Sequence, residues 1–404
     1  MTALLGKYGL PLDITFCKKC TMNNQRPAST VEFKQTDKEQ KQTLAFGKDG
    51  ICDACHYAEM KKSINWNDRE KELTALCNRF RRNDGRYDVV VPGSGGKDSV
   101  QAAHVLKYKY NMNPILITWP PALYTSIGKR NFNSWLDAGF ANYTYNQNKK
   151  LHRFLTNKAF LNLGHPFQPF ILGQKNLAPR LSVLLDIPLV VFGENEAEYG
   201  NAIEDNEKPT RDSKYYSAEL SLKDLVLGGV PAEELINKHG FKLSDLEAYF
   251  PVNPYEIEKT STEVHYLGYY MKWHPQETYY YSVENSNFMP NDHRTEGSFS
   301  KYSSLDDKIE WLNFHTTYIK FGIGRATYDS AQEIRNGDIT RDEGIMLVKR
   351  FDGEFPNQYI NDCCDYMDIN LQDYHDTIEK FRTPHLWEKR NGIYELKNPI
   401  WEID

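Results

Sequence analysis

The sequence predicts an α/β protein built around a parallel sheet, because short β-branched runs alternate with helical patterns along the chain. Residues 87–91 (YDVVV) form the first run, and a glycine-rich segment followed by apolar residues at helical spacing comes directly after them. Two further runs lie at 114–118 (PILIT) and 188–192 (PLVVF), and the clearest helical patterns are 151–163 and 174–185. We expect helices to cover both faces of the sheet.

Length and composition restrict the class of protein. The 404 residues leave room for two or three domains and for a core that needs no disulfides. With 40% hydrophobic and 26% charged residues, the composition excludes a disordered, collagen-like or membrane-spanning protein, and no run approaches the roughly 18 apolar residues of a membrane helix. The net charge of −6 disfavours a surface that coats nucleic acid. We expect a cytoplasmic protein, since the N-terminus lacks the pattern of a signal peptide.

Four of the seven cysteines form two C-x-x-C pairs, Cys17/Cys20 and Cys52/Cys55, separated by 31 residues. Two residues between thiolates let one turn direct both sulfurs at one ion, and two such turns complete a tetrahedral zinc site. Protein ligands fill all four positions, so the spacing predicts a structural Zn²⁺. The alternative is two unrelated reduced pairs. The other cysteines lie outside any such pattern: Cys77, Cys363 and Cys364.

The strongest signal is the segment 93–99 (GSGGKDS) between the first predicted strand and a helix, here called the phosphate loop. Glycines let the backbone approach a ligand and turn N–H groups toward it, and the following helix adds its positive N-terminal end. Lys97 adds charge, and Asp98 can hold Mg²⁺. The predicted polyphosphate-binding residues are Ser94, Gly95, Gly96, Lys97, Asp98 and Ser99. The alternative is a polar turn without a ligand.

The phosphate loop is neither a Walker A loop nor a dinucleotide fingerprint. A Walker A loop needs a glycine where Val91 stands and a serine or threonine where Asp98 stands. The dinucleotide pattern that begins at Gly93 also fails at Asp98. The pattern that remains is S-G-G-x-D-S.

Ligands of parallel sheets bind at the carboxyl ends of the strands, so three loops should converge on one site. These are the phosphate loop, residues 119–132 and residues 193–201 (GENEAEYGN). The third loop is dense in carboxylates. Glu194 and Asn195 are its candidates for contact with a metal or for orienting an incoming nucleophile, and a solvated acidic loop is the alternative.

The second half of the chain predicts a late strand at 263–273, a helix from about residue 275 and a helical part from residue 305 onward. In that helical part, 329–335 and 340–350 should form two helices, with Thr340 as N-cap and Glu343 three residues later.

A bend with two glycines, residues 321–324, lies among three basic residues, Lys320, Arg325 and Arg341. It could hold a sugar carboxylate or a diphosphate, or it could be a solvated helix junction. Taken together, the patterns predict a zinc-binding segment at 1–62, an α/β domain at 63–290 and a helical region for substrate or partner at 291–404.

The S-G-G-x-D-S segment resembles the pyrophosphate-binding loop of the PP-loop ATP pyrophosphatases, which have a HUP-like (adenine nucleotide alpha hydrolase) fold. The cysteine pairs, GEN at 193–195, YLGYYMKW at 266–273 and YIKFGIGRATYDSAQEIRNGDITRDEG at 318–344 make the chain similar to the N-acetyl sugar amidotransferases of that group. These act in bacterial surface-polysaccharide (LPS O-antigen) biosynthesis, on pseudaminic, legionaminic or diacetamido-uronic acids.

This resemblance implies a reaction on a nucleotide-linked or nonulosonic sugar. ATP and Mg²⁺ would adenylate the oxygen of an acetamido group with release of pyrophosphate, and ammonia would then displace AMP to leave an acetamidino group. The catalytic residues would be Lys97, Asp98, Glu194 and Asn195. Arg325 and Lys320 would bind the sugar acid.

Ammonia is expected to come from a partner protein. Thr2 follows Met1, so an N-terminal cysteine glutaminase is absent, and no nucleophile motif surrounds the remaining cysteines. In the family that the chain resembles, the partners are glutaminase and barrel subunits similar to those of imidazole glycerol phosphate synthase.

Two other classes of function remain open. A tRNA-thiolating PP-loop enzyme would carry cysteine chemistry near the α/β core, but no cysteine lies between Cys77 and Cys363, and the acidic net charge fits tRNA poorly. A zinc-ribbon interaction protein would carry a degenerate loop, whereas residues 94–99 are intact. ATP consumption with and without a candidate sugar separates the three.

Overall fold

A five-stranded, fully parallel sheet lies at the centre of the computed structural model, which describes residues 5–28, 39–205 and 207–403. In spatial order its strands are β3 (Asn142–Thr144), β2 (Pro114–Thr118), β1 (Val89–Pro92), β4 (Leu189–Phe192) and β7 (Glu263–Tyr266). The α/β prediction is therefore confirmed. The boundaries at residues 62 and 290 stay a prediction.

Strand residues alternate between two apolar clusters, so both faces of the sheet are buried. Val90 packs with α5 (Lys149–Leu163) and α6 (Gln168–Leu185). Its neighbour Val91 packs with α2 (Trp66–Phe80) and α3 (Lys97–His104) on the opposite face. This burial on two sides explains the continuous β-branched runs.

Two strands differ from the sequence prediction. The strand β3 is short and mostly exposed, and it was not predicted, because its three residues carry no apolar pattern. The predicted strand 263–273 ends at Tyr266, where the chain turns into α10 (Leu267–Tyr270). The turn brings Gly268 against the loop after β4, and its N–H donates to the Gly193 carbonyl at 2.8 Å. This tertiary contact therefore ends the strand at Tyr266, although the sequence pattern predicts extended structure up to residue 273.

The remaining elements surround this core. Between β4 and β7 lie the hairpin β5 (Val226–Leu227) and β6 (Val230–Pro231) and the helices α7 (Ala232–Asn237), α8 (Leu243–Leu246) and α9 (Pro254–Lys259). The helix α4 (Ser126–Asp137) follows β2, and α11 (Pro275–Ser286) follows α10. The C-terminal part has α12 (Lys308–Phe321), α13 (Arg325–Asn336), α14 (Arg341–Phe351), α15 (Ile360–Met367), α16 (Leu371–Phe381) and the hairpin of β8 (Trp387–Arg390) and β9 (Ile393–Leu396).

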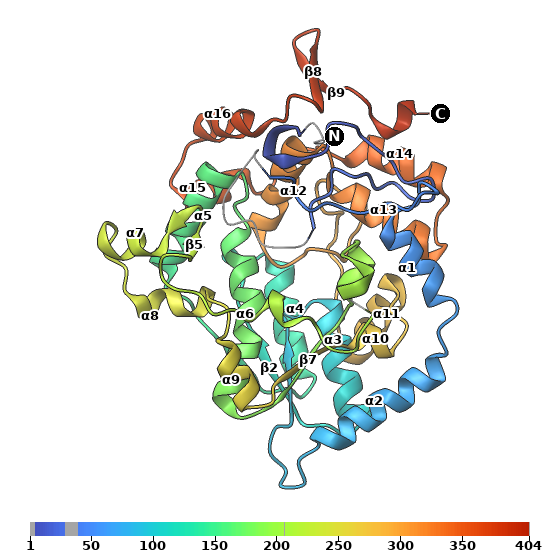
Figure 1. The fold of residues 1–404 in the computed structure, drawn as a ribbon, viewed down its shortest axis with the longest axis vertical. Coiled ribbons are helices and arrows are strands. Elements are labelled where there is room, and N and C mark those ends of the chain that lie inside the picture. The colour runs from blue at the N-terminus through green and yellow to red at the C-terminus, as the bar shows by residue number, and fades with distance from the viewer. Residues whose placement is uncertain (1–4, 29–38, 206, 404) are drawn as a thin grey trace.

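The helical C-terminal part is largely as predicted. The capping box of Thr340 and Glu343 forms at the start of α14, with the Glu343 N–H donating to the Thr340 hydroxyl at 3.3 Å. The β8–β9 hairpin was not predicted, and it projects from the top of the molecule in Figure 1.

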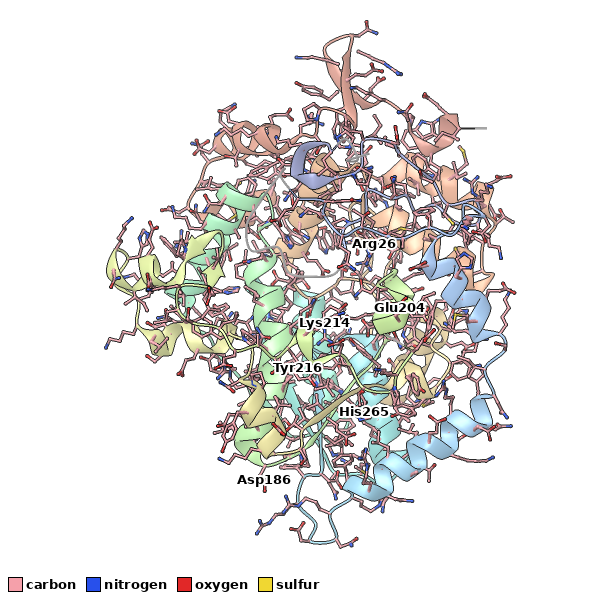
Figure 2. All side chains as sticks on the ribbon, in the orientation of Figure 1. Arg26, Asp186, Glu204, Lys214, Tyr216 and His265 are labelled. Atoms are coloured by element: carbon pink, nitrogen blue, oxygen red, sulfur yellow. The ribbon has the colours of Figure 1, made fainter. Side chains whose placement is uncertain are left out.

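The N-terminal segment packs with the C-terminal helices, in the upper half of the molecule in Figure 1. The Tyr8 hydroxyl donates to the carbonyl of Phe381 at 3.1 Å, and the Thr21 hydroxyl donates to the carbonyl of Thr327 at 3.0 Å. Arg26, labelled in Figure 2 above the loop that carries Glu204, donates to the Gly200 carbonyl at 3.4 Å. The two ends of the sequence therefore form one side of the fold together.

Within the described ranges, every helix is too short or too polar to cross a bilayer.

The helix α6 lies so close to β2 that a side chain at Gly173 would collide with Trp119. An added Cβ would lie 2.1 Å from Cε2 of the indole, which is itself buried against Tyr145 and Tyr249. Alanine is normally favoured over glycine inside a helix by about 1 kcal/mol, whereas overpacking costs about 1–3 kcal/mol. We expect Gly173→Ala to lower the free energy of unfolding by about 1 kcal/mol, measured by urea denaturation.

Gly344→Ala is the matched control, because an added Cβ there meets the movable end of Ile334 at 2.6 Å inside a helix, and its effect should be neutral or stabilising. Equal stability changes in the two variants would contradict the close packing of α6.

Candidate active site and metal centre

A cavity of about 250 Å³ lies at the carboxyl ends of the strands. All three loops that the sequence predicted to converge contribute to its lining. They supply residues 94–98 of the phosphate loop, Gly128 and Asn131 in the first half of α4, and Glu194 and Tyr199 after β4. The opposite wall comes from the C-terminal part, here called the C-terminal wall: Tyr302, Ser303, Ser304, Leu305, Asp306, Glu310, Arg325 and Gln332.

The phosphate loop is shaped by glycines that lie against neighbouring backbone. Gly95 has a φ of +92°, and a Cβ there would lie 2.6 Å from Cα of Phe132 in α4. A Cβ on Gly93 would lie 2.2 Å from that of Ser99. Gly96 is the N-cap of α3, and a Cβ there would meet open space. The N-terminus of α3 therefore faces the cavity, an arrangement that favours an anion.

Lys97 and Asp98 lie at the cavity with fixed partners. Lys97 Nζ contacts Asp98 Oδ2 at 2.7 Å and lies 5.4 Å from the centre of the Trp273 ring. The indole Nε1–H of Trp273 donates to Asp98 Oδ1 at 2.8 Å. A carboxylate oxygen has more than one acceptor site, so Asp98 keeps the capacity to bind a cation. The contacts with Trp273 were missed because 175 residues separate it from Asp98.

Glu194 is a cavity carboxyl group whose ionisation is altered by its surroundings. The Tyr199 hydroxyl donates to its Oε1 at 3.2 Å. Burial raises the pKa of Glu194 to about 7, and the negative charge of Asp98 adds to that rise. A carboxyl group that titrates near neutral pH can accept or return a proton, as a general base or acid must.

The C-terminal wall combines one cation, Arg325, with two carboxyl groups, Asp306 and Glu310. Arg325 Nε contacts Asp329 Oδ1 at 2.8 Å, and its guanidinium lies 5.3 Å from the Phe314 ring. Burial raises the pKa of Glu310 to about 8, although Arg325 opposes the rise. Sequence reasoning found Arg325 but missed the rest of the wall, because serine, aspartate and tyrosine at 302–310 form no motif.

Three predicted site residues are not among the described residues that line the cavity. The Ser99 hydroxyl donates to the Gly96 carbonyl at 2.9 Å and closes the first turn of α3. Asn195 is fully buried, and its side chain accepts the Ala197 N–H at 2.8 Å as the cap of a 3₁₀ turn. Lys320 is 1% exposed and donates to the Leu163 carbonyl at 2.7 Å.

The polar groups of Ser99, Asn195 and Lys320 thus bond to the backbone, and their contacts with a ligand stay a prediction. Arg341, the third basic residue near the glycine bend, also points elsewhere and donates to the Cys17 carbonyl at 3.4 Å.

The four paired cysteines lie together in a buried cluster. Their sulfurs are all within 4.8 Å of one another, with Cys17 and Cys55 at 3.8 Å and Cys20 and Cys52 at 3.7 Å. A disulfide would need about 2.05 Å. Four thiolates about 2.3 Å from a zinc ion form a tetrahedron with edges of about 3.8 Å, so this donor set fits Zn²⁺.

Arg335 supplies buried positive charge next to the cysteine cluster. Although burial opposes it, the charges of Cys20, Cys55 and Cys52 raise the pKa of Arg335. Four thiolates around a divalent ion leave a net negative charge, which a nearby guanidinium offsets.

Comparisons with known proteins bear on the C-terminal part. Residues 296–400 match the family model described as "LPS biosynthesis protein WbpG-like, C-terminal domain". This segment contains the whole C-terminal wall, from Tyr302 to Gln332. An uncharacterized protein of Methanocaldococcus jannaschii is 33% identical over 67 residues, which are 17% of this chain and 24% of that relative. The chain thus covers about a quarter of that relative's length. The family match is the finding that connects the C-terminal part of this chain with LPS biosynthesis.

The cysteine geometry predicts one tightly bound zinc ion per chain. Cys52→Ala should abolish stoichiometric zinc in purified protein, measured by elemental analysis, because three thiolates no longer complete the tetrahedron. Cys77→Ala is the matched control, since Cys77 is buried but lies outside the cluster. Unchanged zinc in the Cys52 variant, or its loss in the Cys77 variant, would contradict the assignment.

The raised pKa of Glu194 predicts a pH-dependent cost to folding. The folded state holds this proton up to a pKa of about 7, whereas the ordinary pKa of a glutamate is about 4.5. The stabilisation is therefore complete below pH 4.5 and is lost as the pH rises through 7. Glu194→Gln should therefore become more stable relative to the wild type from about pH 5 to about pH 8, as followed by thermal unfolding. Glu219→Gln, at an exposed position, should follow the wild type. Parallel curves for Glu194→Gln and the wild type would rule out the shift.

Proposed function

We propose that the protein is an ATP-dependent amidotransferase of LPS biosynthesis that converts a sugar acetamido group into an acetamidino group. The observation that carries the proposal is one cavity with two walls of different kind. One wall is the phosphate loop at the N-terminus of α3, and the other lies in the segment that matches an LPS biosynthesis family. A nucleotide and a sugar can therefore meet in one place.

The chemistry requires activation, because an amide carbonyl is a poor electrophile and its oxygen a poor leaving group. The amide oxygen attacks the α phosphorus of ATP, and the bond to pyrophosphate breaks. Ammonia then adds at the amide carbon, loses a proton, and AMP leaves with the former amide oxygen. The product is an amidine, with AMP and pyrophosphate released.

Residues at the cavity match the needs of these steps. The helix end and Lys97 offset the charge that develops on the phosphates, and Asp98 would hold Mg²⁺. Glu194, with a pKa of about 7, would take the proton that the attacking ammonia loses. Arg325 would bind the carboxylate of a sugar acid, either a nonulosonic acid or a nucleotide-linked uronic acid. Water must be kept out, since it would return the adenylate to the amide.

Ammonia would come from a partner glutaminase, with a barrel subunit of the kind found in imidazole glycerol phosphate synthase. All seven cysteines are buried, and none lines the cavity among the described residues, which leaves the chain without an evident glutaminase nucleophile there. The same fact argues against tRNA thiolation through a cysteine in this cavity.

The proposal predicts that ATP is cleaved to AMP and pyrophosphate only when an acceptor sugar is present. Purified protein should be incubated with MgATP, ammonium at raised pH and a panel of pseudaminic, legionaminic and diacetamido-uronic sugars. Mass spectrometry should then show one oxygen replaced by NH. Asp98→Asn should reduce turnover at least about a hundredfold, because a metal ligand is lost. ADP as the product, or AMP formation with every sugar unmodified, would refute the proposed reaction.

Replacing Arg325 should weaken the binding of the sugar and leave the binding of ATP unchanged. Losing a charge-assisted hydrogen bond at a buried site weakens binding about ten- to a hundredfold, so Arg325→Gln should raise the KM for the sugar by that factor. The Kd for MgATP should stay within about twofold. Arg350→Gln, an exposed site in the same part of the chain, is the control. An unchanged sugar KM would remove Arg325 from the sugar site.

A further inference from the structure

The helix α1 (Asp53–Lys61) leads from the cysteine cluster to the residues around the cavity. It begins directly after Cys52, contains Cys55 in its first turn and ends at Lys61. Figure 1 shows it beside α13, on the side of the molecule where the chain descends to α2. The helix therefore connects Cys55 of the cluster with Lys61 along one continuous element.

Lys61 is a buried cation with two partners from distant parts of the chain. Its side chain is 6% exposed, and Nζ donates to the carboxylate of Glu198, which is 4% exposed. The same Nζ donates to the main-chain carbonyl of Trp273 at 3.2 Å. Arg335, next to the cysteine cluster, donates to the carbonyl of Glu198 at 2.7 Å.

The segments that hold the two partners of Lys61 also contact two cavity acids, Asp98 and Glu194. Trp273 donates from its indole to Asp98 at 2.8 Å. Glu198 is followed by Tyr199, whose hydroxyl donates to Glu194 at 3.2 Å. One ammonium group thus holds both segments that orient Asp98 and Glu194.

We propose that Lys61 is a positioning residue that links the metal-bound cysteine cluster to the geometry of Asp98 and Glu194. A buried ammonium with two acceptors fixes their separation, whereas an apolar side chain of similar length would leave Glu198 charged and unpaired. The inference rests on the proposed function in one respect, because it assumes that the phosphate loop binds MgATP.

The test compares Lys61→Met with Lys62→Met in the zinc-loaded, full-length protein. Lys62 is the next residue; its side chain is 69% exposed and forms an ion pair with Glu59. Hydrogen–deuterium exchange of peptides covering 193–200 reports on the Glu198 segment without any ligand. Calorimetry gives the Kd for MgATP, and thermal unfolding gives stability.

We expect Lys61→Met to exchange at least about tenfold faster at 193–200 and to bind MgATP at least about tenfold more weakly, while Lys62→Met matches the wild type. Removal of the metal by chelation should reproduce the faster exchange. Trp273→Phe keeps the carbonyl that Lys61 uses but lacks the indole donor, so it should weaken MgATP binding without loosening 193–200. If Lys61→Met does not fold, Glu198→Gln takes its place with the same expectations.

A purely structural ion pair gives a different result. Lys61→Met would then unfold at a lower temperature than the wild type. Well below that temperature, however, hydrogen exchange at 193–200 and the Kd for MgATP would match the wild type. That combination would overturn the inference. If the wild type does not bind MgATP, the proposed function fails, and the exchange and chelation measurements still decide whether Lys61 couples the cluster to this segment.

Discussion

The close approach of the phosphate loop to α4 is the constraint on which the cavity depends. Gly95 adopts a left-handed conformation with its Cα against the backbone of Phe132, where any side chain would collide. The next residue, Gly96, is the N-cap of α3, and Gly96, Lys97 and Asp98 all line the cavity. On its N-terminal side the loop follows β1, which pairs with β2 and with β4 in the parallel sheet.

The cavity lining contains more carboxyl groups than cations. Two cations, Lys97 and Arg325, face several carboxyl groups, and burial raises the pKa of Glu194 and Glu310 to about 7 and 8. Near neutral pH these two carboxyl groups can therefore be uncharged, which lowers the cost of burying them. Such a site would suit the polyphosphate with Mg²⁺ and the amine nucleophile of the proposed reaction.

The cysteine cluster adds rigidity where the apolar core is small. Around it the buried apolar residues are few, and the cluster packs against Ala331 of α13. A metal bound by the four thiolates would supply order that such a small core cannot. Because α13 also carries Arg325 and Gln332, the N-terminal cysteines and the C-terminal wall of the cavity share one supporting helix.

The sequence by itself determined the parallel α/β core, the cysteine cluster and the phosphate loop, because each depends on residues close together in the chain or on a fixed spacing. It also found Glu194 and Arg325. Only the tertiary structure decided which polar residues face the cavity. Asn195 and Lys320 bond to backbone groups that folding brings to them, and Trp273 reaches Asp98 across 175 residues. No local pattern encodes such contacts, since a buried polar group takes whichever partner the packed chain places within reach.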